Sequence, residues 1–191
     1  MQLGFRNLLA ALGLAASLAV PALCHAAFEF SGTRALVAVT ADGQRLPIGT
    51  VQFTPAEAGR ASFKVALQTE LFTDYFLSMR EFKCLPAAKE ISCHVPYPYP
   101  HPAKVDAADL SWLEHNLLFL HKSPAEFGAK LWNGIYFEFA ERGDALVGVP
   151  RAIDLNDISA PPGDLAKPPY DRKRRHDMPA EARWIRELVI E

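Results

Sequence analysis

Two titratable side chains in a leucine-rich stretch have the residue types of acid–base catalysis. Glu114 and His121 lie seven residues apart. In a helix this spacing is two turns, so both side chains face the same way about 10 Å apart. They could then flank one ligand, or each could lie at the rim or bond to the backbone. A carboxylate beside an apolar surface has a raised pKa, as a general acid needs.

Asp74 and Arg80 are two further charged candidates, and both lie in the polar and aromatic segment 73–84. In an extended strand they share a face but lie roughly 20 Å apart, so they are not partners of each other. Each could pair across a sheet, face solvent or contact a ligand. A small hydrolase that uses Glu114 or Asp74 with a histidine is one hypothesis, and it requires these side chains to converge in one cleft.

Four amphipathic rings lie in or near predicted loops: Tyr97, Tyr99, His101 and Trp132. Such rings are common at interfaces and in sugar or peptide grooves. Prolines alternate with the first three rings over residues 97–102, which excludes a helix or central strand and favours an extended, polyproline-like segment. The rings are candidate contacts with a ligand or partner, or they brace a loop against the domain.

The basic run Arg-Lys-Arg-Arg-His at 172–176 could contact phosphates, acidic lipid headgroups or an acidic partner. Asp171 and Asp177 bracket the run, and prolines precede it. We therefore expect a solvated linker.

Two of the three cysteines, Cys84 and Cys93, lie outside the N-terminal segment. An even pair in an exported protein predicts a disulfide. The alternative is a zinc site that adds His94 and His101, but the cysteine spacing is longer than zinc motifs use. We predict the disulfide, no metal site and no cofactor.

The N-terminal segment has the features of an export signal. Arg6 precedes an apolar run at 8–20, Pro21 breaks it, and small residues surround Ala26, where we place cleavage. The run is shorter than the ~20 residues that span a bilayer. We predict a periplasmic or secreted protein with no transmembrane segment after cleavage.

Composition and motifs narrow the function further. The chain is 50% hydrophobic and 22% charged, with a net charge of −2, which is typical of one globular domain and gives no general attraction to nucleic acid. It contains no Gly-x-Ser-x-Gly elbow, glycine-rich phosphate loop, His-Glu-x-x-His or Cys-x-x-Cys motif. We therefore expect a binding protein rather than an enzyme.

Hydrophobic periodicity predicts an α+β fold that is mainly antiparallel β. We expect a curved meander or partly closed barrel of about seven strands, with one long helix packed on it and a C-terminal helix. The expected strands are 28–40, 49–54, 62–68, 75–84, 90–95, 134–140 and 145–149, and the helices are 106–122 and 179–190. The expected regions are a signal peptide (1–26), one β-rich domain (27–170), and a basic linker with the C-terminal amphipathic helix (171–191).

Residues 72–100 combine Phe-Thr-Asp-Tyr-Phe-Leu-Ser-Met-Arg, the cysteine pair and Val-Pro-Tyr-Pro-Tyr. This stretch resembles a family of exported proteobacterial proteins with no assigned activity. The resemblance continues in Leu-Phe-Leu-His-Lys (118–122) and Leu-Trp-Asn-Gly-Ile-Tyr (131–136). It implies a bacterial, periplasmic home and no mechanism.

Three functional hypotheses follow. The first is an exported binding or interaction domain with an apolar pocket or aromatic groove, which takes a small apolar ligand or an envelope protein. The second is an envelope structural or inhibitor-type protein, and the third is the small hydrolase. A structure with neither a cavity nor an apolar groove would exclude the pocket form of the first hypothesis.

Overall fold

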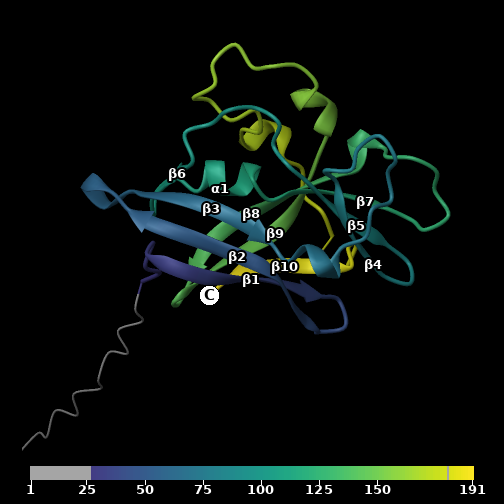
Figure 1. Ribbon diagram of the computed structural model, residues 1–191, viewed down its shortest axis with the longest axis horizontal. Helices are drawn as coiled ribbons and strands as arrows, with labels where there is room; N and C mark the ends of the chain where they lie inside the picture. Colours follow the sequence, from purple (N-terminus) through teal and green to yellow (C-terminus); the bar gives the residue numbers. More distant parts are fainter. Residues whose placement is uncertain (1–26, 180) are drawn as a thin grey trace, which may run out of the picture.

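One antiparallel sheet of ten strands, curved into a half-barrel, dominates the computed structural model, which describes residues 27–179 and 181–191 (Figure 1). The predicted export signal lies outside these residues. The sheet order is β4-β5-β7-β8-β9-β10-β1-β2-β3-β6. The strands are β1 (Gly32–Thr40), β2 (Arg45–Pro55), β3 (Ala61–Leu67), β4 (Lys83–Pro86), β5 (Ile91–Val95), β6 (Lys104–Val105), β7 (Leu118–Lys122), β8 (Gly134–Arg142), β9 (Ala145–Ile153) and β10 (Ile185–Ile190).

The first and last strands lie side by side in the middle of the sheet. Leu36 of β1 pairs with Ile190 of β10, and Ala35 and Glu191 exchange two backbone hydrogen bonds of 2.8 and 3.1 Å. This pairing joins a meander of β1, β2 and β3 to the remaining strands. The antiparallel character expected from the alternating segments is thus confirmed, with more strands than expected.

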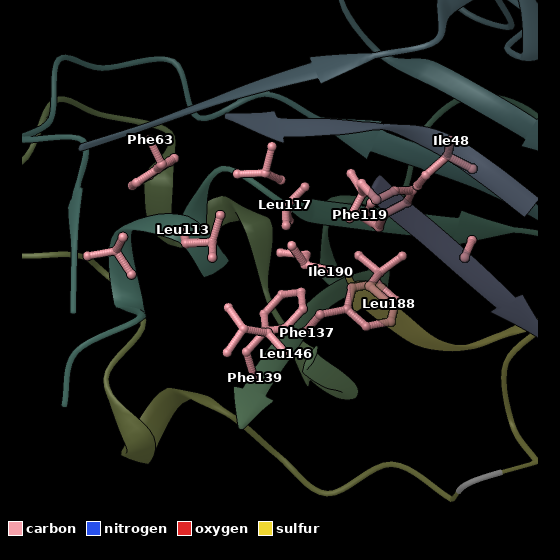
Figure 2. Packing of buried hydrophobic residues seen from close by; sticks show 14 of the residues in the cluster. Ile48, Phe63, Leu113, Leu117, Phe119, Phe137, Phe139, Leu146, Leu188 and Ile190 are labelled. Carbon is pink, nitrogen blue, oxygen red and sulfur yellow. The ribbon is translucent and has the colours of Figure 1, made fainter. Parts of the chain in front are cut away.

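The main core fills one side of the curved sheet (Figure 2). Leu113 and Leu117, from the helix and the turn after it, pack beside Phe119 of β7, Phe137 of β8 and Ile190 of β10. All five side chains are fully buried. Five hollows on the described part of the chain, of about 160–680 Å³, are open at the surface.

A second core covers the opposite face of β5, β7 and β8. Phe76 and Phe82 cover it from the loop before β4, and Ile158 and Tyr170 cover it from the segment after β9. The central strands at this end of the sheet are therefore buried on both faces.

The predicted long helix 106–122 is wrong. The only α-helix in the described residues is α1 (Ser111–His115), and Leu118–Lys122 is strand β7. Leu118 and Leu120 face the second core, whereas Phe119 faces the main core. A strand buried on both faces has no polar alternation, so its apolar run has the same appearance as a buried helix.

The predicted C-terminal helix 179–190 is also wrong, because Ile185–Ile190 is strand β10. The pairing with β1 shifts register here: Val39 pairs with Glu187 but Thr40 pairs with Ile185. This bulge adds one residue, so Ile185 and Leu188 both enter the main core. Their spacing of three residues imitates the period of an amphipathic helix.

The predicted strand 75–84 is largely a loop. Strand structure begins only at β4, and Thr73 forms an isolated bridge with Cys84. The loop folds back because Phe76 and Phe82, in edge-to-face contact at 5.8 Å, cover the second core. The aromatic residues that suggested a strand therefore lie in a loop, where they pack over the second core.

Candidate functional site

A single helical turn places two titratable side chains in the interior. Asp109 accepts the Ser111 N–H (3.0 Å) at the start of α1. At the end of α1, the side-chain amide of Asn116 donates to the Trp112 carbonyl (2.8 Å). Glu114 and His115 of this turn are 4% and 0% exposed, so every polar atom they carry needs a partner.

Glu114 is fully engaged by inward-facing donors. One carboxylate oxygen accepts the Phe139 N–H (2.8 Å), and the other accepts the Tyr136 hydroxyl. The Arg175 guanidinium lies 3.9 Å away. Burial raises the pKa of Glu114, while these three groups oppose the increase. The direction of the pKa shift predicted for Glu114 is therefore found. In the described structure, however, this carboxylate joins α1 to β8 through its two hydrogen bonds.

Arg175 is the part of the basic run that enters the structure. Its guanidinium lies 4.1 Å from the centre of the Tyr136 ring, pairs with Glu138 (3.2 Å) and donates twice to the Tyr170 carbonyl (3.0 and 2.8 Å). Arg172–Arg174 form an exposed 3-10 turn beside it. The expectation of a solvated linker thus describes this turn and not Arg175.

His115 joins α1 to the segment that follows β9. Its Nδ1 donates to the Ser111 carbonyl (2.6 Å), and its Nε2 accepts the Tyr170 N–H (3.1 Å). Burial lowers the pKa of His115 to about 4. Both ring nitrogens are occupied, so this histidine cannot exchange a proton with Glu114.

The structure separates the predicted pair Glu114 and His121. His121 lies on β7, opposite Ser92 of β5, instead of two helical turns beyond Glu114. Burial and the nearby Arg183 lower the pKa of His121 to about 4. The convergence that the hydrolase hypothesis requires of Glu114 is therefore not found.

Asp74 and Arg80 do not converge with the other candidates. The Asp74 carboxylate binds the Lys83 ammonium (2.6 Å), and both groups are substantially exposed. Arg80 is exposed in the loop between β3 and β4. An exposed ion pair contributes at most about 1 kcal/mol to stability, so the Asp74–Lys83 pair adds little to the free energy of unfolding.

Three of the four predicted rings do come together. The Tyr97 ring lies 5.8 Å from Tyr99 and 6.0 Å from His101, and His101 stacks on Trp112 of α1 at 5.3 Å. Tyr97 also meets His115 edge-on at 6.1 Å. Trp132 lies elsewhere, 63% exposed, in a 3-10 turn before β8. The alternating Tyr-Pro segment therefore braces α1 with some of its rings.

The remaining faces of Tyr97 and Tyr99 line an open groove of about 470 Å³. The opposite wall comes from residues 157–174. Its side chains are apolar or charged, and the charges form two ion pairs, Asp157–Arg174 and Asp164–Lys167. The wall comprises Ile158, Ala160, Pro161, Pro162, Pro168, Pro169, Asp157, Asp164, Asp171, Lys167 and Arg174. In Figure 1 both segments pass above α1, the first in teal and the second in yellow-green. We call this feature the tyrosine–proline groove.

One polar atom at the groove is unsatisfied. The Tyr97 hydroxyl is buried and has no hydrogen-bond partner among residues 27–179 and 181–191. Burial also raises the pKa of Tyr97, so the hydroxyl keeps its proton and is a donor. A buried donor without an acceptor costs about 1–3 kcal/mol of stability, so this hydroxyl is a local cost of packing Tyr97 against α1.

Tyr170 fixes the proline wall in place. Its N–H donates to His115, its carbonyl accepts from Arg175, and its hydroxyl donates to the Asp154 carbonyl (2.8 Å). Its ring stacks on His115 at 5.5 Å. Since Tyr97 also contacts the His115 ring, residues from both walls of the groove pack on the same imidazole.

The two cysteines of the predicted disulfide lie side by side. Cys84 of β4 and Cys93 of β5 are directly paired in the sheet, and their sulfurs lie at disulfide distance. Thiols joined in this way cannot serve as zinc ligands. No group of three His, Cys, Asp or Glu side chains in the described ranges could hold a metal ion.

Comparisons with known proteins found no match among protein families, curated proteins or solved structures. The resemblance to exported proteobacterial proteins accordingly stays a prediction. In the described residues no helix is long and apolar enough to cross a membrane.

Sequence reasoning missed Tyr136 and Tyr170, and it treated Arg175 only as part of the basic run. Each of the three makes a contact with a residue at least 22 positions away: Tyr136 with Glu114, Tyr170 with His115 and Arg175 with Glu138. No local pattern in the sequence indicates these contacts.

Proposed function

We propose that the protein is an exported, non-catalytic binding protein of the bacterial cell envelope, which holds its partner in the tyrosine–proline groove. The predicted signal at 1–26 and the Cys84–Cys93 pair support export, because disulfides persist in oxidising compartments. If the bound partner is an envelope protein, the role is structural or inhibitor-type.

The observation that carries the proposal is the tyrosine–proline groove, whose two walls come from distant segments of the chain. Loops on a rigid scaffold are the usual location of binding sites. Here both walls are fastened to α1, through Tyr97 and through the Tyr170–His115 hydrogen bond. A surface that is already ordered loses little conformational entropy when it binds.

The filled core favours a surface groove over an interior pocket. Similarly, the engaged nitrogens of His115 and the position of His121 favour binding over hydrolysis. The charged groups around Glu114 are explained by folding, since they join α1, β8 and the segment after β9.

Site-directed photo-crosslinking tests the proposal. Tyr99 is replaced by p-benzoylphenylalanine in the full chain, and the matched control carries the same residue at Gln52, which is exposed on β2. After irradiation of intact cells, we expect an adduct of defined mass from position 99 only. We expect that adduct to disappear when Tyr97→Ala is added. Equal labelling at both positions, or none at position 99, would contradict the proposal.

Fractionation of the same cells tests export. We expect the protein in the periplasmic or secreted fraction, as a mature chain that begins at Ala27. We expect its intact mass to lie 2 Da below the mass calculated for the reduced chain. An unprocessed chain in the cytoplasm with free thiols would contradict this part of the proposal.

A further inference from the structure

The exposed apolar side chains of this protein gather on two loops. In the described residues six large apolar side chains are exposed, and five of them come from the loop before β4 (68–82) and the loop between β7 and β8 (123–133). These five are Leu71, Tyr75, Leu77, Phe127 and Trp132. Both loops pack against the second core, the first through Phe76 and the second through Leu131. They therefore lie at the same end of the sheet, which the labels β4, β5 and β7 mark in Figure 1.

The first loop has a fixed base and a protruding side chain. The rings of Phe76 and Phe82 meet edge to face at 5.8 Å, and the Lys122 ammonium lies 5.6 Å from the centre of the Phe76 ring. Leu77 follows directly and is 94% exposed. An isobutyl group held in water in this way gains free energy wherever an apolar medium receives it.

The second loop is built in the same manner. Glu126 accepts the Ser123 N–H (2.7 Å) and forms an ion pair with Lys130, which closes the loop at its base. Phe127 lies between the two partners of that ion pair and is 102% exposed. Trp132 follows in the 3-10 turn and presents most of its indole to solvent.

The form of this surface indicates what covers it. A side chain that is almost wholly exposed has no apolar neighbours around it, so Leu77 and Phe127 are separate protrusions and not parts of one flat face. A protein partner would need a matching hole for each protrusion, because specific interfaces are packed as densely as protein interiors. Lipid chains fit around separate protrusions without such matching. An indole, with its apolar body and one N–H, suits the headgroup level of a bilayer.

The charges near the protrusions are balanced. With the flanking Lys83 and Lys122, the two loops carry four acidic and four basic side chains. Two of the four carboxylates are paired within the loops, Asp74 with Lys83 and Glu126 with Lys130. A bilayer therefore neither repels nor attracts this surface through net charge, and burial of apolar area decides the binding.

We propose that the loops 68–82 and 123–133 bind the surface of a lipid bilayer, with Leu77 and Phe127 inserted among the acyl chains and Trp132 at the headgroups. The protein rests on the membrane through these side chains and does not cross it. No residue that lines the tyrosine–proline groove belongs to either loop. The inference therefore goes beyond the proposed function, and each of the two can fail without the other.

Flotation of the mature full chain with phosphatidylcholine vesicles tests this inference. One myristoyl chain binds a bilayer with an association constant of about 10⁴ M⁻¹, and we expect half-maximal flotation at roughly 0.1–1 mM accessible lipid for three inserted side chains. Replacing about a third of the lipid by phosphatidylglycerol should change the affinity less than about 3-fold, because the loops carry no net charge. Absence of flotation at about 5 mM lipid would overturn the inference.

Matched variants separate insertion from folding. Leu77→Ser combined with Phe127→Ser should weaken flotation at least about 30-fold and leave the unfolding temperature unchanged, because neither side chain packs in the protein. The control Leu165→Ser removes the exposed large apolar side chain that lies outside the two loops, and it should float like the wild type. Equal flotation of the double variant and the wild type, or an equal loss in the control, would overturn the inference.

Fluorescence quenching locates the contact. Vesicles that contain a phosphatidylcholine with a doxyl group near the headgroup should quench the wild type, and this quenching should disappear in Trp132→Phe. The other two tryptophans are suitable internal controls, because Trp112 is buried and Trp184 packs against the main core. Quenching that persists in Trp132→Phe would place the membrane contact elsewhere and would overturn the inference.

Two other results would assign these loops or the lipid binding differently. A dimer in sedimentation that the double variant dissociates, without flotation of the wild type, would replace the bilayer by a second copy of the chain. Flotation only with phosphatidylglycerol, lost at high salt and retained by the double variant, would point to the exposed basic turn Arg172–Arg174. Either result would overturn the inference.

Discussion

Acid should destabilise this protein in part through His115, because folding holds this side chain in its neutral form. His115 has no exposed surface, and its two ring nitrogens serve one donor and one acceptor role, to Ser111 and from Tyr170. Protonation would put a second N–H against the Tyr170 N–H. It would also place a positive charge near Arg175, which already lowers the pKa of His115. The neutral ring is therefore strongly preferred in the folded protein.

The size of the effect follows from the pKa shift. Burial lowers the pKa of His115 from 6.5 to about 4, and each pKa unit corresponds to about 1.4 kcal/mol, so the full effect is about 3 kcal/mol. Because the pKa is depressed on folding, the unfolded chain binds the proton first. The contribution is complete above pH 6.5 and is lost as the pH falls toward 4.

Urea unfolding at pH 7.5, 6.5, 5.5 and 4.5 measures this contribution. The variant His115→Gln keeps an acceptor for the Tyr170 N–H and cannot titrate, and the control His176→Gln changes an exposed histidine. Near pH 5 we expect the free energy of unfolding of the wild type to fall about 1 kcal/mol per pH unit more steeply than that of His115→Gln. The control should follow the wild type.

Other groups contribute to the background of this experiment but not to the difference. Folding also lowers the pKa of His94 and His121, which adds acid sensitivity, and raises the pKa of Glu114, which opposes it. These groups are present in all three proteins. An identical pH dependence in His115→Gln and wild type would refute the assignment of the effect to His115.

Four further variants test the packing of the site, the disulfide and the surface. Glu114→Gln should lower the free energy of unfolding by about 1–3 kcal/mol at neutral pH in a urea titration, because it removes the charge that accepts two buried hydrogen bonds; a loss below 0.3 kcal/mol would contradict that role. Replacing Cys84 and Cys93 together by alanine should cost about 2–3 kcal/mol through the larger entropy of the unfolded chain, measured against the oxidised wild type. An equal loss on reduction of the wild type is the control. Leu77→Ser and Phe127→Ser should each leave the free energy of unfolding within about 0.5 kcal/mol, since these side chains are 94% and 102% exposed, and a larger loss in thermal melts would show that they pack.

The amino-acid sequence by itself determined the elements whose side chains alternate. Residues 49–54 and 62–67 show a period of two and lie in β2 and β3, which alternate between buried and more exposed positions. Residues 134–140 also alternate and lie in β8, although the first half of that strand is buried on both faces. The pairing of Cys84 with Cys93 was equally accessible, because two cysteines outside the signal allow one disulfide. Local patterns are sufficient where one face of a strand is buried and the other is wet.

The tertiary structure alone decided the elements whose burial breaks that pattern. Strand β7 is covered on both faces, and the bulge in β10 places Ile185 and Leu188 on one face, so each imitates a helix until its neighbours are known. The sequence indicated Tyr97 and Tyr99 as candidate contacts, but it did not indicate which segment lies across the groove from them. That wall is held by Tyr170 on His115, 55 residues apart, and no local pattern encodes a contact made only when distant segments pack together.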